Sequence, residues 1–424
     1  MEWSGVVSRD SNLKDTELVE KGRVSFDWAR SNMPAFALAE RHLRSEIKKF
    51  GRNPLRGKKI AASLHVSKET SVLIAALVGL GAEITLVAAN PLSSQPEMIA
   101  YLSSIGVEVN AKRGETEQEY KKAINSAARK EPDLIIDDGA ELHVAYSSTG
   151  SKSCIGGTDE TTSGTDRLRV LAERGRLRYP VFAVNEAQTK HIFDNRYGTG
   201  QSTMDGLLRA TSLLIAGKVV VVAGYGWVGS GVALRARGLG ARVIVTEVNP
   251  VRALEAHLNG FEVQTMNKAA ELGDIFLTCT GQTDVIRREH FLRMRGGAIV
   301  GNAGHFNREI DVKGLFRLGD KVEQVREGLT RVSVNGKSIF LLTQGRVVNL
   351  ASAEGHPPEV MQFSFSNQLL CLYRLAAGKE RGKGVLQVPK EIDDLVASLS
   401  LKAFHLRIDS LSSRQTKYAQ TFTR

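Results

Sequence analysis

The chain has 424 residues, of which 42% are hydrophobic and 24% are charged, and this composition excludes a disordered or fibrous protein. Its formal net charge of +11 is not accompanied by a nucleic-acid-binding motif, so we expect no nucleic-acid partner. No apolar stretch is long and uncharged enough to cross a membrane, and the three cysteines lack metal-ligand spacing. We therefore expect a cytoplasmic chain of about two or three domains, without metal ions, disulfides or membrane contact.

The first half of the chain alternates expected strands with expected helices. Strands are predicted near 59–64, 83–88, 107–110, 134–136 and 181–184, with helical segments between them. This alternation is typical of a parallel sheet that is covered by helices on both faces. We therefore predict a doubly wound α/β domain for this half.

Polar side chains follow three of these strands directly. His65 comes after the first strand, Asp138 after the fourth and Asn185 after the fifth. Each has a structural explanation of its own, as a hydrogen-bonded core histidine, a turn residue and a cap. Ligands of open parallel sheets, however, bind beyond the carboxyl ends of the strands. The three residues together therefore predict a site at this edge.

A second alternating series begins at Lys218 with "KVVVVAGYGWVGSG", which predicts a buried strand, a glycine turn and a helix. Gly224, Gly226 and Gly229 would let the backbone approach a pyrophosphate at the positive end of that helix. Glu247 ends the next strand, where a carboxylate would bind a ribose 2′-hydroxyl and repel a 2′-phosphate. Two further strands are predicted in "DIFLTCTG" and "GAIVGNAG". The series thus predicts an NAD-binding Rossmann domain.

Two polar stretches lie between the halves. "DETTSG", residues 159–164, could be a helix N-cap, and "TKHIFDN", residues 189–195, could carry an ordinary ion pair between Lys190 and Asp194. Their place beside the expected domain boundary, a polar and glycine-bearing segment at 195–202, favours a role where a cofactor meets a substrate.

The chain resembles the S-adenosylhomocysteine hydrolases from about Val24 to about Phe422. The motifs that carry this resemblance occur in order along the sequence: "SLHVSKET", "NPLSSQ", "DDGAEL", "DETTSG", "TKHIFDNRYGTGQS", "VVVAGYGWVGSG", "GNAGHF" and "GRVVNL" followed by "GHP". Several unrelated patterns in one order are far more specific than the glycine turn alone.

The resemblance implies an architecture. It predicts two doubly wound parallel-sheet domains, with a Rossmann NAD domain at 200–353 inserted into a substrate domain formed by 1–195 and 354–388. A C-terminal oligomerisation segment at 389–424 would pack on a partner subunit in a homotetramer. Each subunit would hold one tightly bound NAD that is recycled during turnover.

The resemblance also implies the reaction, the reversible hydrolysis of S-adenosyl-L-homocysteine to adenosine and L-homocysteine. In that family NAD⁺ oxidises the ribose 3′-hydroxyl, and the resulting ketone acidifies the 4′ proton so that homocysteine is eliminated. Water then adds, and the cofactor returns its hydride. Two alternatives stay open: a hydrolase that prefers the deaminated S-inosylhomocysteine, and an NAD-dependent dehydrogenase of the 2-hydroxy-acid type. A third alternative is a regulatory relative that binds NAD but has no catalytic activity. Loss of Lys190, His65 or Asp138 would have favoured it, and all three are present.

The catalytic residues follow from the same resemblance. Lys190 would take the proton of the 3′-hydroxyl, which requires that its pKa fall from ~10.4 to about 7–8 through burial or a nearby nicotinamide. Asp194 and Glu160 would hold the ribose hydroxyls. His65 and Asp138 would handle the 4′ proton, the leaving thiolate and the entering water, with the division between them left open.

Binding residues are carried over in the same way. Glu69 would accept from the exocyclic amine of adenine, with Ser67, His305 and His356 also at the substrate. The expected cofactor-binding residues are Thr161, Thr162, Ser163, Asn195, Gly224, Gly226, Trp227, Val228, Gly229, Ser230, Gly231, Glu247, Gln282, Ala303, Gly304, His305 and Asn349.

The chain departs from the family pattern at several positions. Ala140 stands where a second glycine is usual after the two aspartates, Glu141 replaces an aspartate, and Gln344 replaces a glutamate. We expect the first two changes to affect the loop that carries Asp138. The sequence ends at "KYAQTFTR", so we expect a short form without the longer tail that reaches a neighbouring subunit's cofactor in many members.

Overall fold

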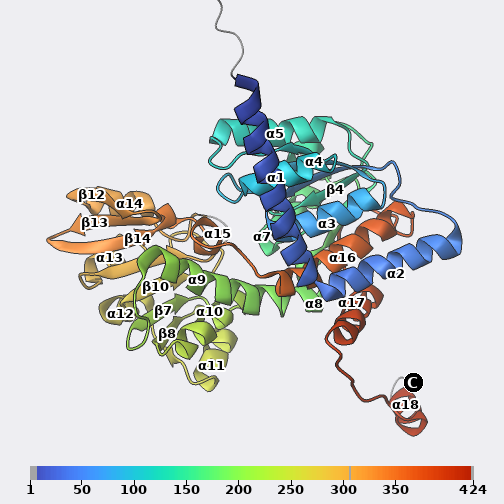
Figure 1. The fold of residues 1–424 in the computed structure, drawn as a ribbon. Coiled ribbons are helices and arrows are strands. Elements are labelled where there is room, and N and C mark those ends of the chain that lie inside the picture. Colours follow the sequence, from blue (N-terminus) through green and yellow to red (C-terminus); the bar gives the residue numbers. More distant parts are fainter. Residues whose placement is uncertain (1–6, 305–306, 422–424) are drawn as a thin grey trace, which may run out of the picture.

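The computed structural model describes residues 7–304 and 307–421, which fold around two mainly parallel sheets (Figure 1). The first sheet has seven strands in the order β15-β6-β5-β4-β1-β2-β3, and the second has eight in the order β12-β13-β14-β11-β10-β7-β8-β9. Helices cover both faces of each sheet. The predicted α/β class with two doubly wound parallel sheets is therefore confirmed. No helix within the described ranges is long and apolar enough to cross a membrane.

All strands of the first sheet run parallel to their neighbours. Its strands are β1 (Lys59–Leu64), β2 (Glu83–Ala88), β3 (Glu108–Asn110), β4 (Leu134–Asp137), β5 (Gly156–Asp159), β6 (Pro180–Ala183) and β15 (Gly384–Gln387). The sequence predicted all of them except β5 and β15, because these two are short and begin with glycine. At Gly157 a Cβ atom would lie 2.6 Å from the His143 ring and from the Ile135 carbonyl oxygen, so the packing of β5 requires glycine there.

The helices around the first sheet come from both ends of the chain. They are α1 (Val7–Ser31), α2 (Pro34–Phe50), α3 (Lys68–Gly79), α4 (Pro96–Ser104), α5 (Glu117–Arg129), α6 (Glu141–Ser147), α7 (Thr162–Glu173), α16 (Pro358–Ala376) and α17 (Lys390–Ala403). One core joins one face of the sheet to α1–α4, α16 and α17, and the other joins the opposite face to α5–α7. The chain thus returns to the first sheet after completing the second.

The second sheet has a parallel part and an antiparallel edge. Its strands are β7 (Val219–Ala223), β8 (Arg242–Thr246), β9 (Glu262–Val263), β10 (Ile275–Thr278), β11 (Ala298–Asn302), β12 (Lys321–Arg326), β13 (Leu329–Val334) and β14 (Lys337–Leu342). Its helices are α9 (Thr199–Thr211), α10 (Trp227–Gly238), α11 (Pro250–Leu258), α12 (Met266–Leu272), α13 (Arg288–Arg293) and α14 (Val312–Leu318). The β12-β13-β14 meander was not predicted from the sequence.

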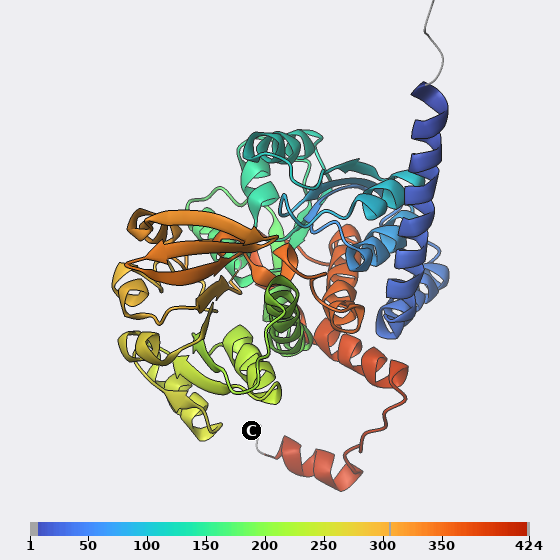
Figure 2. The same cartoon turned by 60° about the vertical axis from the view of Figure 1, so that its left-hand side comes forward.

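Two segments connect the sheets. The first comprises α8 (Gln188–His191), a π-helical turn (Asp194–Gly198) and α9, so the polar stretch expected at the domain boundary is helical. Its glycines serve packing rather than flexibility: a Cβ at Gly200 would lie 2.7 Å from the carbonyl carbon of Gly231 on α10. The second segment carries α15 (Val348–Ala351) and leads into α16. Beyond α17, an extended stretch holds α18 (Ser413–Gln420) away from both sheets (Figure 2).

Candidate active site

The candidate site lies at the carboxyl edge of the first sheet, where the strand order reverses. β1 and β4 are neighbours, but β2 lies on the outer side of β1 and β5 on the outer side of β4. The crevice between two such strands is where open parallel sheets bind ligands. His65 follows β1 and Asp138 follows β4, while Glu160 follows β5, the next strand along. The structure brings all five expected catalytic residues to this edge: His65, Asp138, Glu160, Lys190 and Asp194.

Lys190 is fully enclosed by oxygen acceptors. Its Nζ donates to Asp194 Oδ1 at 2.9 Å, to Asn185 Oδ1 at 3.0 Å and to Asn195 Oδ1 at 3.0 Å, and lies 3.4 Å from Glu160 Oε1. Burial by itself lowers the pKa of Lys190, but the charges of Asp194 and Glu160 outweigh it and the net pKa is raised. In the protein alone the neighbouring carboxylates therefore favour the ammonium form of Lys190, and the lowering of its pKa that a base requires stays a prediction for the NAD-bound enzyme.

Glu160 is held by side chains from the far end of the chain. Ser364 Oγ lies 2.5 and 2.7 Å from the two carboxylate oxygens and can donate its proton to one of them, and Gln368 Nε2 donates to Oε2. Burial raises the pKa of Glu160 to about 7, although Lys190 opposes the shift. Glu160 can therefore exchange a proton near neutral pH. Ser364 and Gln368 were not predicted, although polar residues on a buried helix face are a signal that could have indicated them.

Asp194 connects Lys190 to the second of the two segments that join the sheets, the one that carries α15. Its Oδ2 lies 3.0 Å from His356 Nδ1, and His356 Nε2 lies 3.1 Å from Thr199 Oγ1. Burial favours the neutral acid, yet Lys190 and His356 hold the pKa of Asp194 well below its usual value. Burial likewise opposes the charged imidazole, but Asp194 raises the pKa of His356. The side chain of His356 thus supports the charge cluster, whereas His305 lies outside the described residues.

His65 and Asp138 form a second, separate pair. His65 Nε2 lies 3.2 Å from Asp138 Oδ2, and His65 Nδ1 lies 2.7 Å from Ser93 Oγ. Ser93 Oγ also donates to the carbonyl oxygen of Asn90 at 2.9 Å. The Ser93 hydroxyl has one proton, and it donates that proton to Asn90. Its oxygen can therefore only accept a hydrogen bond from His65 Nδ1–H. His65 then exchanges protons through Nε2. Ser93 was not predicted, although it lies in the "NPLSSQ" motif.

The loop behind Asp138 accommodates its unusual sequence. Ala140 adopts φ 63°, a left-handed conformation that glycine would take without strain, and it is fully buried. Glu141 begins α6 and pairs with Arg167 at 2.8 Å. The backbone N–H of Asp138 donates to Asp137 Oδ1 at 2.9 Å, and this hydrogen bond fixes the backbone at Asp138. The structure thus shows a left-handed conformation at Ala140, and the effect of the two substitutions on the position of Asp138 stays a prediction.

The expected adenine-binding residues begin α3, directly after β1. Ser67 is the N-cap of this helix, and its Oγ accepts from the N–H of Thr70 at 3.4 Å. Glu69 lies in the first turn and is 3% exposed. Burial raises the pKa of Glu69, opposed chiefly by the charge of Lys68. A buried acid therefore lies beside the catalytic edge.

The glycine turn joins β7 to α10, again at a point where the strand order reverses. Gly224 has φ +95°, and a Cβ at Gly229 would lie 1.9 Å from the Gly224 carbonyl oxygen. No side chain fits at these two positions, so the turn exposes backbone at the start of α10. Glu247, at the end of β8, accepts backbone N–H groups from Tyr225 at 2.7 Å and Asn249 at 2.9 Å. These bonds overcome burial and lower the pKa of Glu247.

The residues present fit a dinucleotide. Among the buried side-chain polar atoms that have no hydrogen-bond partner within the described ranges, three belong to the expected cofactor set: Thr161 Oγ1, Ser163 Oγ and Asn349 Oδ1. Buried polar atoms are usually paired, so a polar ligand at these three positions would satisfy groups that the protein alone leaves unpaired.

The other expected cofactor residues lie along both sheets. Thr162 and Asn195 are bound to Asn185 at 2.6 and 3.0 Å. The rest lie around the carboxyl edge of the second sheet: Gly226, Trp227, Val228, Ser230 and Gly231 on or before α10, Gln282 after β10, and Ala303 and Gly304 after β11.

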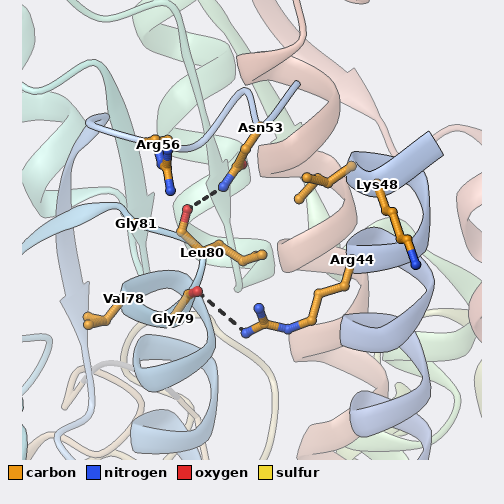
Figure 3. Close-up of a pocket in the computed structure, with 9 residues that line it drawn as sticks. Arg44, Lys48, Asn53, Arg56, Val78, Gly79, Leu80 and Gly81 are labelled. Carbon is orange, nitrogen blue, oxygen red and sulfur yellow. Dashed lines mark hydrogen bonds between the residues drawn. The ribbon is translucent and has the colours of Figure 1, made fainter. Parts of the chain in front are cut away.

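A cavity of about 370 Å³ lies elsewhere, between α2 and the turn after α3 (Figure 3). Arg44 donates there to the carbonyl oxygen of Gly79 at 3.4 Å, and Asn53 Nδ2 donates to that of Leu80 at 2.7 Å. None of the expected catalytic or cofactor-binding residues lines this cavity. It is therefore separate from the candidate site.

One doubly wound sheet carries a buried lysine–carboxylate cluster, and the segment from α8 to α9 joins it to a second sheet with a Rossmann-type glycine turn. These features define the class as a two-sheet NAD-dependent enzyme. Residues 10–152 match the family model for S-adenosyl-L-homocysteine hydrolase, and residues 195–355 match the model for its NAD-binding domain.

Similar proteins extend over nearly the whole chain. Adenosylhomocysteinase of Sulfurisphaera tokodaii is 50% identical, over 96% of this chain and 98% of its own length. Adenosylhomocysteinase of Aquifex aeolicus is 50% identical, over 97% and 98%. S-inosyl-L-homocysteine hydrolase of Methanocaldococcus jannaschii is 47% identical, over 96% and 98%. The chain belongs to the S-adenosyl-L-homocysteine hydrolase family and is an NAD-dependent hydrolase.

Proposed function

We propose that this enzyme reversibly hydrolyses S-adenosyl-L-homocysteine to adenosine and L-homocysteine. The observation that carries the proposal is the burial of Lys190, Asp194 and Glu160 in one cluster at the carboxyl edge of the first sheet. Family membership favours this reaction over the 2-hydroxy-acid dehydrogenase alternative.

Lys190 would move the proton of the ribose 3′-hydroxyl. Bound NAD⁺ supplies reversible oxidation at the 3′ carbon of the substrate. Lys190 must lose a proton before it can act as a base, and the neighbouring carboxylates raise its pKa in the protein alone. A positive nicotinamide beside it would lower that pKa, and Glu160, whose Oε1 lies 3.4 Å from Nζ, could then take up the proton. Lys190 Nζ can then accept the hydroxyl proton, while Asp194 keeps the amine oriented.

His65 and Asp138 would act together at the other end of the ribose. Their facing atoms are 3.2 Å apart, so the pair can hold one proton between His65 Nε2 and Asp138 Oδ2. We propose that the pair takes the 4′ proton and returns a proton to the sulfur of the leaving homocysteine. Ser93, bound to His65 Nδ1, would keep this exchange on Nε2.

The expected cofactor residues divide between the two sheets. Thr161, Ser163 and Asn349 would hold the nicotinamide ribose, the glycine turn the pyrophosphate, and Glu247 the adenosine ribose. The 2.7 Å bond from the Tyr225 N–H supports a fixed orientation for the Glu247 carboxylate. His305 and Gln282 complete the set by resemblance.

The domain limits, the assembly and the compartment are also proposals. We propose a substrate domain of 1–195 and 354–388, an NAD domain of 200–353 and an oligomerisation segment of 389–424, whose helix α17 also packs on the first sheet of its own protomer. The return of β15 to the first sheet supports the inserted arrangement. A cytoplasmic homotetramer is proposed from the family resemblance.

The test is to incubate the purified protein with S-adenosyl-L-homocysteine and to measure free thiol together with the redox state of the nicotinamide. Thiol release without net accumulation of NADH is expected, because the cofactor is recycled. One NADH accumulated for each substrate consumed, without free thiol, would contradict hydrolysis and favour a dehydrogenase. Protein stripped of NAD is the matched control and should release no thiol until NAD is restored.

A further inference from the structure

Lys68, the first residue of α3, lies between two carboxylates. Its Nζ is 3.2 Å from Glu69 Oε1 and donates to Glu354 Oε2 at 2.7 Å. Arg209 on α9 lies 3.7 Å from the other oxygen of Glu354. These ion pairs therefore connect Glu69, the acid proposed to face the purine base, with α9, the helix that leads into the second sheet.

The two carboxylates differ in their surroundings. Glu69 is almost fully enclosed, with its side chain 3% exposed, whereas that of Glu354 is 60% exposed. An enclosed carboxylate strongly needs a countercharge, and Lys68 is the cation beside it; solvent screens the pair with Glu354. Glu354 nevertheless shares the ammonium group, so it competes with Glu69 for the same positive charge.

The ionisation of Glu69 decides which purines it can recognise. An ionised carboxylate only accepts hydrogen bonds, and so suits the 6-amino group of adenine. A protonated carboxyl also donates, and so can pair with the 6-carbonyl of hypoxanthine. Removing the neighbouring cation would favour the protonated form, because burial raises the pKa of Glu69 and the charge of Lys68 opposes that shift.

We propose that Lys68 determines nucleobase specificity: by pairing with Glu69, it keeps the base pocket selective for a 6-amino over a 6-oxo purine. The inference rests on the proposed hydrolase function, and it assigns a role to a residue that does not itself touch the base. Lys68 is thus a positioning residue that acts through Glu69.

The experiment compares kcat/KM for S-adenosyl- and S-inosyl-L-homocysteine in the NAD-loaded wild type, Lys68→Met and Lys68→Arg. Lys68→Met keeps the apolar stem but removes the charge, and the ratio of the two values should fall about tenfold. Lys68→Arg should restore most of the ratio. A purely structural defect would lower both values together and leave their ratio unchanged, and that result would overturn the proposal.

Two further variants sharpen the comparison. Glu354→Gln removes the competing acid but leaves the charge of Lys68, so the ratio should stay the same or rise; a fall as large as that of Lys68→Met would contradict the inference. Lys121→Met removes an exposed lysine that pairs with Glu117 on α5, and it should change neither value. If the wild type hydrolyses neither substrate, the proposed function fails; if it hydrolyses one and Lys68→Met keeps the wild-type ratio, only the role of Lys68 fails.

Discussion

Lys190 and its acceptors form a set in which each charge depends on the others. The side chains of Lys190 and Asp194 are each 3% exposed and that of Glu160 is 7% exposed, so little water can replace a lost partner. Removing one member of a buried ion pair typically costs about 3–5 kcal/mol, because it leaves an uncompensated charge. Glu160 can relieve part of that cost by taking up a proton, since its pKa is about 7.

Lys190→Met should separate chemistry from cofactor binding. Without an amine at this position, adenosine should no longer reduce the bound NAD⁺, while the NAD content should stay close to that of the wild type. The melting temperature should fall more at pH 8 than at pH 6, because loss of Lys190 raises the pKa of the buried Glu160 further, and an acid with a raised folded-state pKa costs stability as the pH rises. Nicotinamide absorbance and thermal unfolding provide the measurements. Reduction at the wild-type rate would remove Lys190 from this role.

Ser93→Ala should slow the steps assigned to His65 and leave the oxidation step intact. Loss of the hydroxyl removes the group 2.7 Å from His65 Nδ1, so the imidazole is no longer directed towards Asp138. We expect exchange of the 4′ proton of bound adenosine with heavy water to slow by about 10–100-fold, with NAD reduction unchanged. Ser94→Ala is the matched control, because the neighbouring Ser94 is also buried but its Oγ has no hydrogen-bond partner within the described ranges. Equal exchange rates in both variants would show that Ser93 does not position the histidine.

The sequence identified the charged residues of the site better than their neutral supports. Lys190 and Asp194 could be predicted because they occur together in a recognisable motif. Ser364 could not, since it is 204 residues from its partner Glu160 and nothing local marks a serine as a carboxylate donor. The raised pKa of Lys190 was also missed, because it depends on distances between side chains that only the fold brings together.

At the scale of elements, α10 contains one glycine whose position cannot hold a side chain, Gly229, and another whose position can, Gly238. Gly229→Ala should abolish NAD retention and lower the stability by several kcal/mol, because the new Cβ would overlap the Gly224 carbonyl oxygen at 1.9 Å. Gly238→Ala, in the last turn of the same helix, meets nothing within 4 Å and should leave NAD retention unchanged, with stability equal or up to about 1 kcal/mol higher. NAD content after gel filtration and urea unfolding measure the two effects. Equal behaviour of the two variants would contradict the tight-turn argument.

Elements with a strong apolar pattern were predictable, and those defined by their neighbours were not. β1 and β7 are buried apolar runs that enter polar turns, so sequence alone located them. β5 reads "GGTD" and is a strand only because β4 and β6 supply partners on both sides. The helical crossing through Gly198 and Gly200 was missed because glycine normally indicates a loop, whereas here it permits contact between helices.

At the scale of the whole molecule, the crossing segments are tied to each other as well as to their sheets. The Asp194–His356 contact joins the first crossing to the second, and the Lys68–Glu354 contact joins α3 to the second. The proposed active site lies where these segments meet. Relative movement of the two units would therefore act directly on the groups around the substrate, as expected for an enzyme that must exclude water until elimination has occurred.

The C-terminal arm, residues 406–421, contributes little to the protomer and should serve assembly. Three of its apolar side chains are well exposed, with Leu406 at 56%, Ile408 at 74% and Leu411 at 68%, and α18 stands apart from both sheets (Figure 2). Exposed apolar side chains gathered on one segment are typical of an interaction surface. Deleting residues 406–424 should leave the far-UV circular dichroism per residue nearly unchanged while lowering the molar mass measured by sedimentation equilibrium. The full-length triple variant Leu406→Ser, Ile408→Ser, Leu411→Ser keeps the length of the chain and should show the same loss if the apolar groups are responsible. An unchanged molar mass in both proteins would exclude the arm from the subunit interface and would leave the proposed homotetramer to be held by other surfaces.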